Sequence, residues 1–431
     1  MSSCIFRDGI LLAGCAEERF SRIKRDPSFP HNAIQFCLKE AGITFSELNS
    51  ISVGWNPAFY MEKKNNVVLK ALKDKGMIIY HVINELGSAE YTDSLSNIDQ
   101  NLFFKDGSKI PIEFIDHHFA HASYAFHNSG YESALTVVLD GFGEIHTGGI
   151  FKMDNYESEI ITNSKFPHSI GLFYSAITQY LGFRTNSDEW KIMALASMGD
   201  SQNYKDDFSK MIKVGKNSFN GFLELDLSYF DFYNFFTTGY TSDKFNLKYG
   251  KPRKFNEPLE QKHKDIAKAL QEVVEEKVIE LLCNLSSEFP LEKNLCLSGG
   301  FFMNSALNGK IRNLTSFNDP FIGATPDDTG IALGSVISTL RKNNLAKNFK
   351  QIHNSYGPKF SNNEIIKELE ISKINFEILT NLEEDASKYL ADGKIIGWFQ
   401  GRSELGQRAL GNRSILASPT FDSMKDTINK F

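Results

Sequence analysis

The sequence predicts an α/β protein with more than one domain. Its 431 residues exceed what one ordinary hydrophobic core holds, so two or three domains are expected. Short β-rich runs alternate along the chain with longer segments of helical period. Hydrophobic residues make up 41% and charged residues 23% of the chain, a composition typical of a soluble globular protein.

Bulk features exclude several classes of protein. The net charge of −6 gives no reason to expect nucleic acid as the main partner. No apolar run approaches the roughly 18 to 20 residues that a membrane span needs, and the first residues do not resemble a secretion signal. The five cysteines form no CxxC pair, so we expect free thiols that pack in the protein interior. Reduced cysteines are typical of a cytoplasmic protein, which is what we expect here.

The N-terminal region predicts a hairpin that is followed by charged residues. Asp8 and Gly9 separate two short apolar runs, which is a strong hairpin signal. The segment 17–25, which includes Lys24, then brings several Arg and Lys residues together. An anion-binding edge and a solvated loop both fit this segment. The other elements expected here are strands over 3–6, 10–16 and 50–55, a helix over 31–41, and helices with basic faces within 56–110.

The chemically densest stretch is 112–144, where three histidines occur within five positions. A strand over 112–116 is expected to lead into a helix that begins near His118. His117 and His121 are four residues apart, so on a helix they share a face and can share one ion, whereas His118 points elsewhere. Taken alone, this spacing is more often structural than metal-binding.

An acidic turn follows the next strand. The β-rich run 134–140 ends at Asp140, and Gly141 and Gly143 let the backbone turn tightly and approach a ligand. Successive N–H groups in such a turn form an anion cradle, although a plain turn to a return strand over 148–152 fits equally well. Imidazoles and a carboxylate at this density suggest a divalent metal site.

The middle of the chain predicts a helix over 169–182 that leads to Glu189 and Lys191. These two residues suit either ordinary helix-start chemistry or a contact with phosphate or metal. The aromatic-rich stretch 200–260, with Phe230, Phe232, Tyr233, Phe235 and Phe236, suggests a cap or lid with its own small core.

The segment 261–337 combines helices with glycine-rich turns. A helix over 261–287 precedes a strand over 295–298, which runs into Gly299, Gly300 and, at the next helix start, Asn304. Strand, glycine pair and helix start form a pattern found in nucleotide pockets. Asp328 lies between a strand over 320–324 and a helix over 331–337. Its carboxylate suits either an N-cap of that helix or a second carboxylate ligand of the metal.

The C-terminal part predicts a separate unit. Residues 342–357 are polar and read as a linker. The loop 400–414 carries Arg402, Arg408 and Arg413 among glycines, which fits a phosphate site or a salt-bridged surface loop. The other expected elements are helices over 362–369, 382–391 and 424–431 and a strand over 395–399.

Together these motifs resemble the O-carbamoyltransferases of nodulation-factor and natural-product biosynthesis. The resemblance covers nearly the whole chain in order, and its most specific parts are 16–30 and 393–419. The other motifs that carry it are DHHFAHASYAF (116–126), VVLDGFGE (137–144), the stretch 169–199, LCLSGGFFMNSALNGKI (295–311) and ATPDDTGIALG (324–334).

The resemblance implies a fold and a domain division. Residues 1–341 would form a duplicated domain of the actin, heat-shock ATPase and sugar-kinase type, and 358–431 part of a YrdC-like domain. Both ends look short against the family pattern, which would leave out the first central strand. Because such a strand buries several apolar side chains, at about 1.5–3 kcal/mol each, we expect a poorly stable chain. A cooperative melt above about 45 °C would contradict this.

The resemblance also implies a reaction and its residues. ATP and carbamoyl phosphate would give a carbamoyl adenylate, whose carbamoyl group passes to an alcohol of a small molecule or glycan. His117, His121, Asp140 and Asp328 would bind Fe(II) or another divalent metal. Lys24, Gly299, Gly300 and Asn304 would line the adenylate site, with Gly141, Gly143, Glu189, Lys191, Arg408 and Arg413 as further cofactor-binding residues.

Other functions remain open at this point. A chain that binds nucleotide and metal without turnover is one alternative, and a tRNA threonylcarbamoyl-transfer protein is a weaker one. The loop 393–419 argues against the latter, because it matches the carbamoyltransferase arrangement. A homodimer is compatible with the resemblance, and nothing in the residues names the acceptor alcohol.

Overall fold

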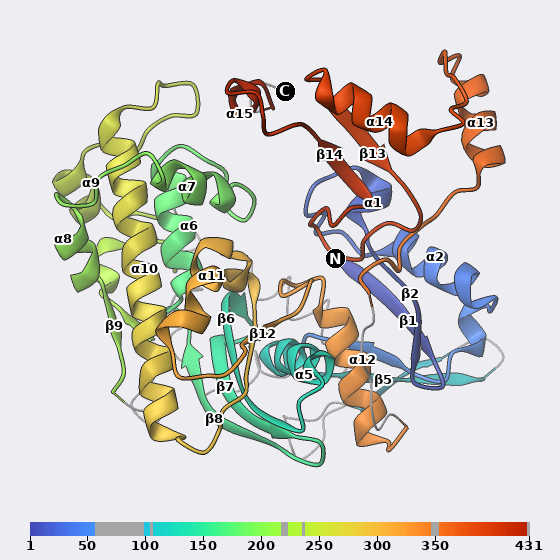
Figure 1. Ribbon diagram of the computed structural model, residues 1–431. Helices are drawn as coiled ribbons and strands as arrows, with labels where there is room; N and C mark the ends of the chain where they lie inside the picture. Colours follow the sequence, from blue (N-terminus) through green and yellow to red (C-terminus); the bar gives the residue numbers. More distant parts are fainter. Residues whose placement is uncertain (57–98, 104–106, 217–222, 235–237, 346–352, 429–431) are drawn as a thin grey trace.

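The computed structural model describes residues 1–56, 99–103, 107–216, 223–234, 238–345 and 353–428 (Figure 1). Most of the region expected to carry basic-faced helices, and Phe235 and Phe236 of the expected lid, lie outside these residues. Within the described residues no helix is long and apolar enough to cross a membrane.

The predicted hairpin opens the chain. Strands β1 (Ser2–Arg7) and β2 (Ile10–Ala16) pair antiparallel. Asp8 and Gly9 join them with φ angles of 52° and 79°, a left-handed conformation that Asp-Gly adopts readily. Helix α2 (His31–Ala41) packs its small apolar face on this hairpin and ends at Gly42, with the predicted boundaries. The short elements α1 (Glu18–Ser21) and η1 (Phe45–Glu47) flank it.

The remaining strands of the first half form a second sheet. Strand β3 (Ile51–Val53) is shorter than predicted and pairs parallel with β5 (Lys109–Phe114). On its other side β5 pairs antiparallel with β4 (Asp99–Phe103). Among the described strands, this sheet and the β1–β2 hairpin are separate.

A five-stranded mixed sheet forms the second half, in the order β12–β11–β6–β7–β8. At its centre β6 (Ser133–Gly143) buries side chains on both faces. Leu135, Val137 and Leu139 face one core, and Ala134 and Val138 face another, as the two-residue period of a strand requires. The other strands are β7 (His146–Asp154), β8 (Ser158–Lys165), β11 (Leu295–Ser298) and β12 (Phe321–Ile322).

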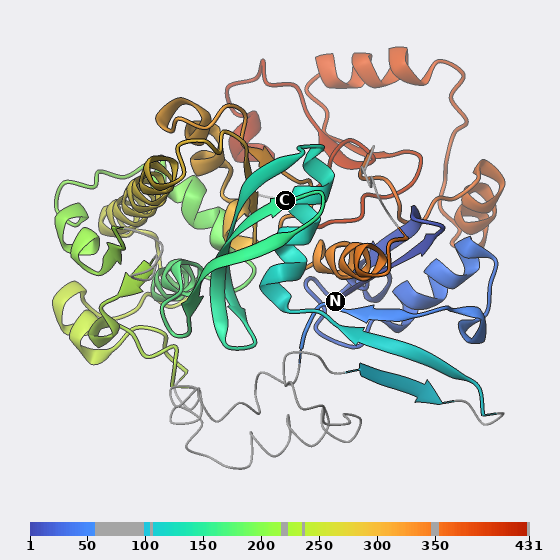
Figure 2. The same cartoon turned by 90° about the horizontal axis from the view of Figure 1, so that it is seen from below.

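Helices cover both faces of this sheet. On one side α6 (Ile170–Tyr180) and the long α10 (Gln261–Glu288) build the largest core. On the other, α5 (His117–Ser129) lies between the sheet and α12 (Ile331–Lys342), which also contacts β1 and β3 (Figures 1 and 2). A side chain at Gly334 would overlap the backbone of Ala120, so glycine lets α5 and α12 approach closely.

Smaller elements complete this half. The aromatic-rich stretch was predicted to have its own small core, but its described residues join the largest core, where Phe230 and Phe245 are completely buried. The smaller elements before α10 are α7 (Glu189–Ala196), α8 (Lys205–Lys210), β9 (Ile212–Val214), β10 (Leu223–Leu225), η4 (Leu227–Tyr229) and α9 (Asp243–Tyr249). Two more follow β11, namely η5 (Gly300–Met303) and α11 (Ser305–Leu314).

The C-terminal unit differs from the rest in burial. Its helices α13 (Asn362–Ile371) and α14 (Leu382–Ala391) contain no buried residue. The hairpin of β13 (Ile396–Phe399) and β14 (Arg413–Leu416) and the short α15 (Met424–Ile428) follow. The most deeply buried of its described residues lie in the loop between the two strands, where Leu405 is completely buried beside Leu11, Tyr124 and Leu333.

The arrangement confirms the predicted α/β class, with mixed sheets between layers of helices. The last residues of the predicted linker bond to other parts of the chain. Gly14 N–H donates to Tyr356 C=O at 3.2 Å, and Gly357 N–H donates to Ser403 C=O at 2.9 Å. The actin-type likeness and the domain boundaries stay predictions.

Candidate metal centre

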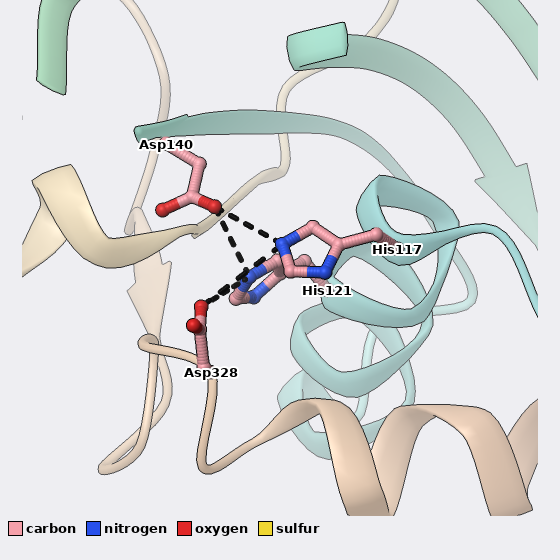
Figure 3. A group of neighbouring side chains, drawn as sticks. All are labelled: His117, His121, Asp140 and Asp328. Atoms are coloured by element: carbon pink, nitrogen blue, oxygen red, sulfur yellow. Dashed lines mark hydrogen bonds and ion pairs between the residues drawn. The ribbon is translucent and has the colours of Figure 1, made fainter. Parts of the chain in front are cut away.

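Four side chains from three parts of the chain converge on one point (Figure 3). His117 and His121 come from the first two turns of α5, Asp140 from β6, and Asp328 from the loop before α12. One ligand atom from each lies within 4.8 Å of the others. These are the four residues predicted to bind metal, and His118 is outside the group, as predicted.

The separations within this group fit one shared ion. Asp140 Oδ2 lies 3.1 Å from His117 Nε2 and 3.8 Å from His121 Nε2. Asp328 Oδ1 lies 4.0 Å and 3.6 Å from the same two nitrogens. Ligands about 2.1 Å from one ion are about 3 to 4 Å apart, so these atoms can coordinate together. His121 Nε2 is buried without a hydrogen-bond partner among the described residues, which leaves it available to a cation.

Neighbouring groups orient the buried ligands. Ser298 Oγ lies 3.3 Å from His121 Nδ1, so the other ring nitrogen faces Asp140 and Asp328. Gly300 N–H donates to Asp140 Oδ1 at 2.9 Å, which leaves Oδ2 to face the histidines. The His117 ring lies against Gly143, where any side chain would overlap it. Each buried ligand therefore has a contact that fixes its direction.

The histidines and carboxylates of the group shift each other's pKa values. Burial alone would lower the pKa of His117, but its hydrogen bond with Asp140 and the negative charges of Asp328, Asp140 and Glu144 raise it to about 9. Burial would raise the pKa of Asp140, yet the bond from His117 and the charges of the histidines lower it below its ordinary value. A divalent ion would supply the positive charge that these carboxylates favour.

Two further ionisable groups lie beside the ligands. Glu144 is completely buried, and its carboxylate accepts from Asn56 N–H at 2.6 Å and His117 N–H at 3.2 Å. Burial and the charge of Asp116 raise its pKa to about 8. His118 is also fully buried, and burial with the charge of His117 holds its pKa well below the ordinary value. Neither side chain belongs to the four-ligand group.

Asp328 differs from the other ligands because its side chain is 74% exposed. The Asp328 side chain does not cap α12. The N-cap of this helix is Gly330, and no side chain there accepts a hydrogen bond from the first N–H groups of the helix. The carboxylate instead faces the histidines, which favours the metal-ligand alternative over the capping one.

The predicted glycines have unequal roles. Gly299 has a φ of 97°, a conformation that L side chains rarely adopt, and a side chain there would overlap Leu139 C=O. Gly300 contacts Asp140, as described above, whereas a side chain at Gly141 would meet nothing within 4 Å. Asn304 caps α11 by accepting from Leu307 N–H at 3.1 Å. Their predicted nucleotide contacts stay predictions.

Two of the predicted charged residues, Lys24 and Lys191, lie near the Trp190 ring. Lys24 Nζ lies 6.0 Å from the Trp190 ring centroid, which links the N-terminal segment to α7. Lys191 pairs with Asp188 at 3.1 Å, and Glu189 accepts from Ser175 Oγ at 2.8 Å. The structure therefore gives Glu189 and Lys191 structural partners, and their predicted ligand contacts remain untested.

The two predicted arginines of the C-terminal loop differ in availability. Arg408 is exposed and makes no hydrogen bond or ion pair with the residues that the structure describes. Arg413 donates to the carbonyls of Gln400, Asn412, Pro358 and Gly401 and stacks over Phe399, with 3.4 Å from Cζ to the ring centroid. Arg413 thus holds the loop together, while Arg408 is free for an anion.

Sequence reasoning missed several residues around the centre. Ser298 directly precedes the glycine pair, and Glu144 ends the acidic turn, so both lay inside motifs that were already noted. Gln271 was not detectable from a motif. It lies on α10, 33 residues before Asn304, and donates to Asn304 Oδ1 at 3.0 Å.

Comparison with known proteins places the chain. The model of the carbamoyltransferase N-terminus matches residues 2–337, and that of the carbamoyltransferase C-terminus matches residues 387–431. The chain belongs to the carbamoyltransferase family. This confirms the predicted family and the predicted enzyme class, a carbamoyltransferase.

Individual relatives agree with this placement. The nodulation protein NolNO of Sinorhizobium fredii is 31% identical over 99% of this chain and 59% of its own length. An uncharacterized protein of Synechocystis is 32% identical over 99% of this chain and 71% of its own length. NolO of Bradyrhizobium diazoefficiens is 31% identical over 73% of this chain and 55% of its own length. The chain thus spans between about half and seven-tenths of these relatives.

A solved structure shows a weaker similarity. HypF of T. kodakarensis aligns with 54% of this chain and 38% of its own at 15% identity, with a TM-score of 0.29. A similarity of this size supports neither a fold nor a function for the present chain.

Proposed function

We propose that this chain transfers a carbamoyl group from a carbamoyl adenylate, formed from ATP and carbamoyl phosphate, to the hydroxyl of a small-molecule or glycan acceptor. The observation that carries the proposal is the group of His117, His121, Asp140 and Asp328 in a chain of the carbamoyltransferase family. Two imidazoles and two carboxylates suit Fe(II), Zn²⁺ or Mn²⁺. The bound ion would offset phosphate charge and polarise the carbamoyl carbonyl.

The chain's own residues would divide the remaining work. Gly299 and Gly300 form a turn beside Asp140, and the nucleotide would bind next to this turn. Lys24 in the N-terminal segment and Arg408 in the C-terminal loop are exposed cations that would bind phosphate groups. The acceptor oxygen would form the new bond to the carbamoyl carbon, the bond to the phosphate oxygen would break, and AMP would leave. The hydroxyl proton would pass to a base or to solvent.

The decisive experiment supplies the adenylate directly. We expect the purified chain to release AMP from carbamoyl adenylate in the presence of Fe(II) or Mn²⁺ and an alcohol acceptor, and Asp328→Asn to reduce this at least about tenfold. A Ser418→Ala variant, outside the centre, is the control.

The outcome also separates the alternatives. Binding of metal and adenylate without AMP release would replace the transferase with a binding-only protein. Failure to bind either the adenylate or ATP would refute the proposal for this chain.

A further inference from the structure

The loop that carries Asp328 receives a contact from the distant C-terminal unit. Asp328 is the most exposed of the four ligands, so its position depends on how its loop is held. Pro326 C=O accepts from Gly299 N–H at 2.7 Å, which fixes one end. At the next residue, the buried Asp327 carboxylate accepts a hydrogen bond from Gln407 Nε2 of the C-terminal unit.

Gln407 itself is held from the other side. Its Oε1 accepts from Arg25 Nε at 3.3 Å, so the amide bridges the N-terminal charged segment and the metal-ligand loop. Gly406, next to it, accepts from Arg19 Nη2 at 2.6 Å through its carbonyl. A neutral amide can donate to Asp327 and accept from Arg25 at the same time, which neither a carboxylate nor an ammonium group can do.

The rest of the segment 403–407 is anchored deeply enough to hold this bridge in place. Leu405 is completely buried between β2, α5 and α12. Gly406 lies so close to Thr325 that a side chain at Gly406 would overlap it. The C-terminal unit thus inserts a rigid piece of backbone directly beside the loop 325–329.

We propose that Gln407 is a positioning residue for Asp328, so that the C-terminal unit completes the metal centre of the preceding residues. This inference rests on the metal centre of the proposed function. Gln407 does not contact the ligands; it acts through Asp327, whose carboxylate also accepts from Thr329 Oγ1 at 3.2 Å. Without the bridge, Asp327 is a buried carboxylate with one fewer partner, and the loop that carries Asp328 loses its side-chain hydrogen bond to the C-terminal unit.

The test compares two glutamines on the same loop. Gln407→Ala removes the bridge, whereas Gln400→Ala removes a side-chain bond to Gly411 C=O away from the metal loop. The probe is Co²⁺ alone, titrated into the whole chain and followed by its visible absorption, which reports coordination geometry. We expect Gln407→Ala to weaken Co²⁺ binding about tenfold and to alter the spectrum, in the range found for groups around a metal site. Gln400→Ala should change neither.

The outcomes separate this inference from the function on which it rests. Equal Co²⁺ affinity and an equal spectrum in Gln407→Ala and the unaltered chain refute the positioning role and leave the metal centre intact. An equal loss of Co²⁺ affinity in Gln400→Ala refutes the positioning role too, because disturbance of the loop as a whole then explains both results. No Co²⁺ binding by the unaltered chain refutes the metal centre and this inference with it. If Gln407→Ala does not fold, Gln407→Asn, whose shorter amide cannot reach Asp327, decides by the same criteria.

Discussion

The residues up to α12 and those after the linker reach their structure in different ways. In the first region, sheets and helices stack in layers, and α10 alone buries residues along its whole length. In the second, α13 and α14 bury none, and large apolar side chains such as Phe360 and Ile378 are 52% and 75% exposed. The second region is nevertheless attached firmly at the loop 403–407. The comparison indicates that a few buried residues can anchor a unit whose own helices have little core.

Hydrogen exchange gives the largest expected contrast between the two regions. Amides of α10 should exchange at least about a thousandfold more slowly than those of α13 and α14, because exchange follows the local opening free energy. The measurement is native-state exchange with mass spectrometry of peptides. Equal protection in α14 and α10 would show that the C-terminal helices have a core that their exposure does not reveal.

The anchor itself can be weakened at Leu405. Leu405→Ala should lower the free energy of unfolding by about 2–5 kcal/mol, because the side chain is completely buried. Leu410→Ala, in the same loop but 55% exposed, should cost less than about 0.5 kcal/mol. Urea denaturation followed by circular dichroism measures both. Similar losses in the two variants would mean that burial of this loop does not hold the units together.

Within the first region, Gly143 tests how tightly the metal centre is built. Gly143→Ala should displace the His117 ring and weaken divalent-metal binding by about 10- to 100-fold. Gly141→Ala, two residues earlier on the same turn, adds a methyl group to open space and should leave metal affinity within about twofold. Calorimetric titration with Mn²⁺ compares them. Equal affinities would show that His117 tolerates displacement.

A pH dependence of stability is also expected, from His127 on α5. Burial and, secondarily, the charge of Arg341 lower the pKa of His127 to about 3 in the folded chain. Because an unfolded histidine titrates near 6.5, the unfolded chain binds more protons between about pH 6.5 and 3. Stability should therefore fall as the pH decreases through this window, by up to about 1.4 kcal/mol per pH unit.

Replacement of this histidine isolates its contribution. His127→Gln should reduce the slope of unfolding free energy against pH between pH 6 and 4.5 by about one proton, whereas His31→Gln, at an exposed position, should not. Urea denaturation at several pH values provides the slopes. An unchanged slope in His127→Gln would assign the acid sensitivity to other groups.

Much of the fold could be predicted because local patterns are strong in this chain. The Asp8–Gly9 turn, the helix ended by Gly42 and the strand 295–298 appear with the predicted type and nearly the predicted bounds. Strand ends were less accurate: β3 is shorter than predicted and β6 is longer, because pairing with neighbouring strands decides where a strand stops.

In the candidate site, too, local patterns predicted some residues and left others undecided. Helical spacing placed His117 and His121 on one face, and it excluded His118. Asp328 was ambiguous, since a carboxylate before a helix suits capping as well as metal binding. Arg413 shows what local reasoning leaves out: a guanidinium among glycines suggested an anion site, and in the folded chain its N–H groups also bond to four backbone carbonyls.

The sequence by itself determined the α/β class and the family, because both depend on residue types and motifs along the chain, and the resemblance to that family supplied the four residues that we propose as metal ligands. Only the tertiary structure decided which groups orient those residues. Ser298 and Gly300 contact ligands directly, and Gln407, 290 residues after His117, contacts Asp327 beside the ligand Asp328. The fold of the backbone brings these distant residues together. Contacts between distant segments leave no local pattern, so the support of the metal centre by the C-terminal loop became visible only in the folded chain.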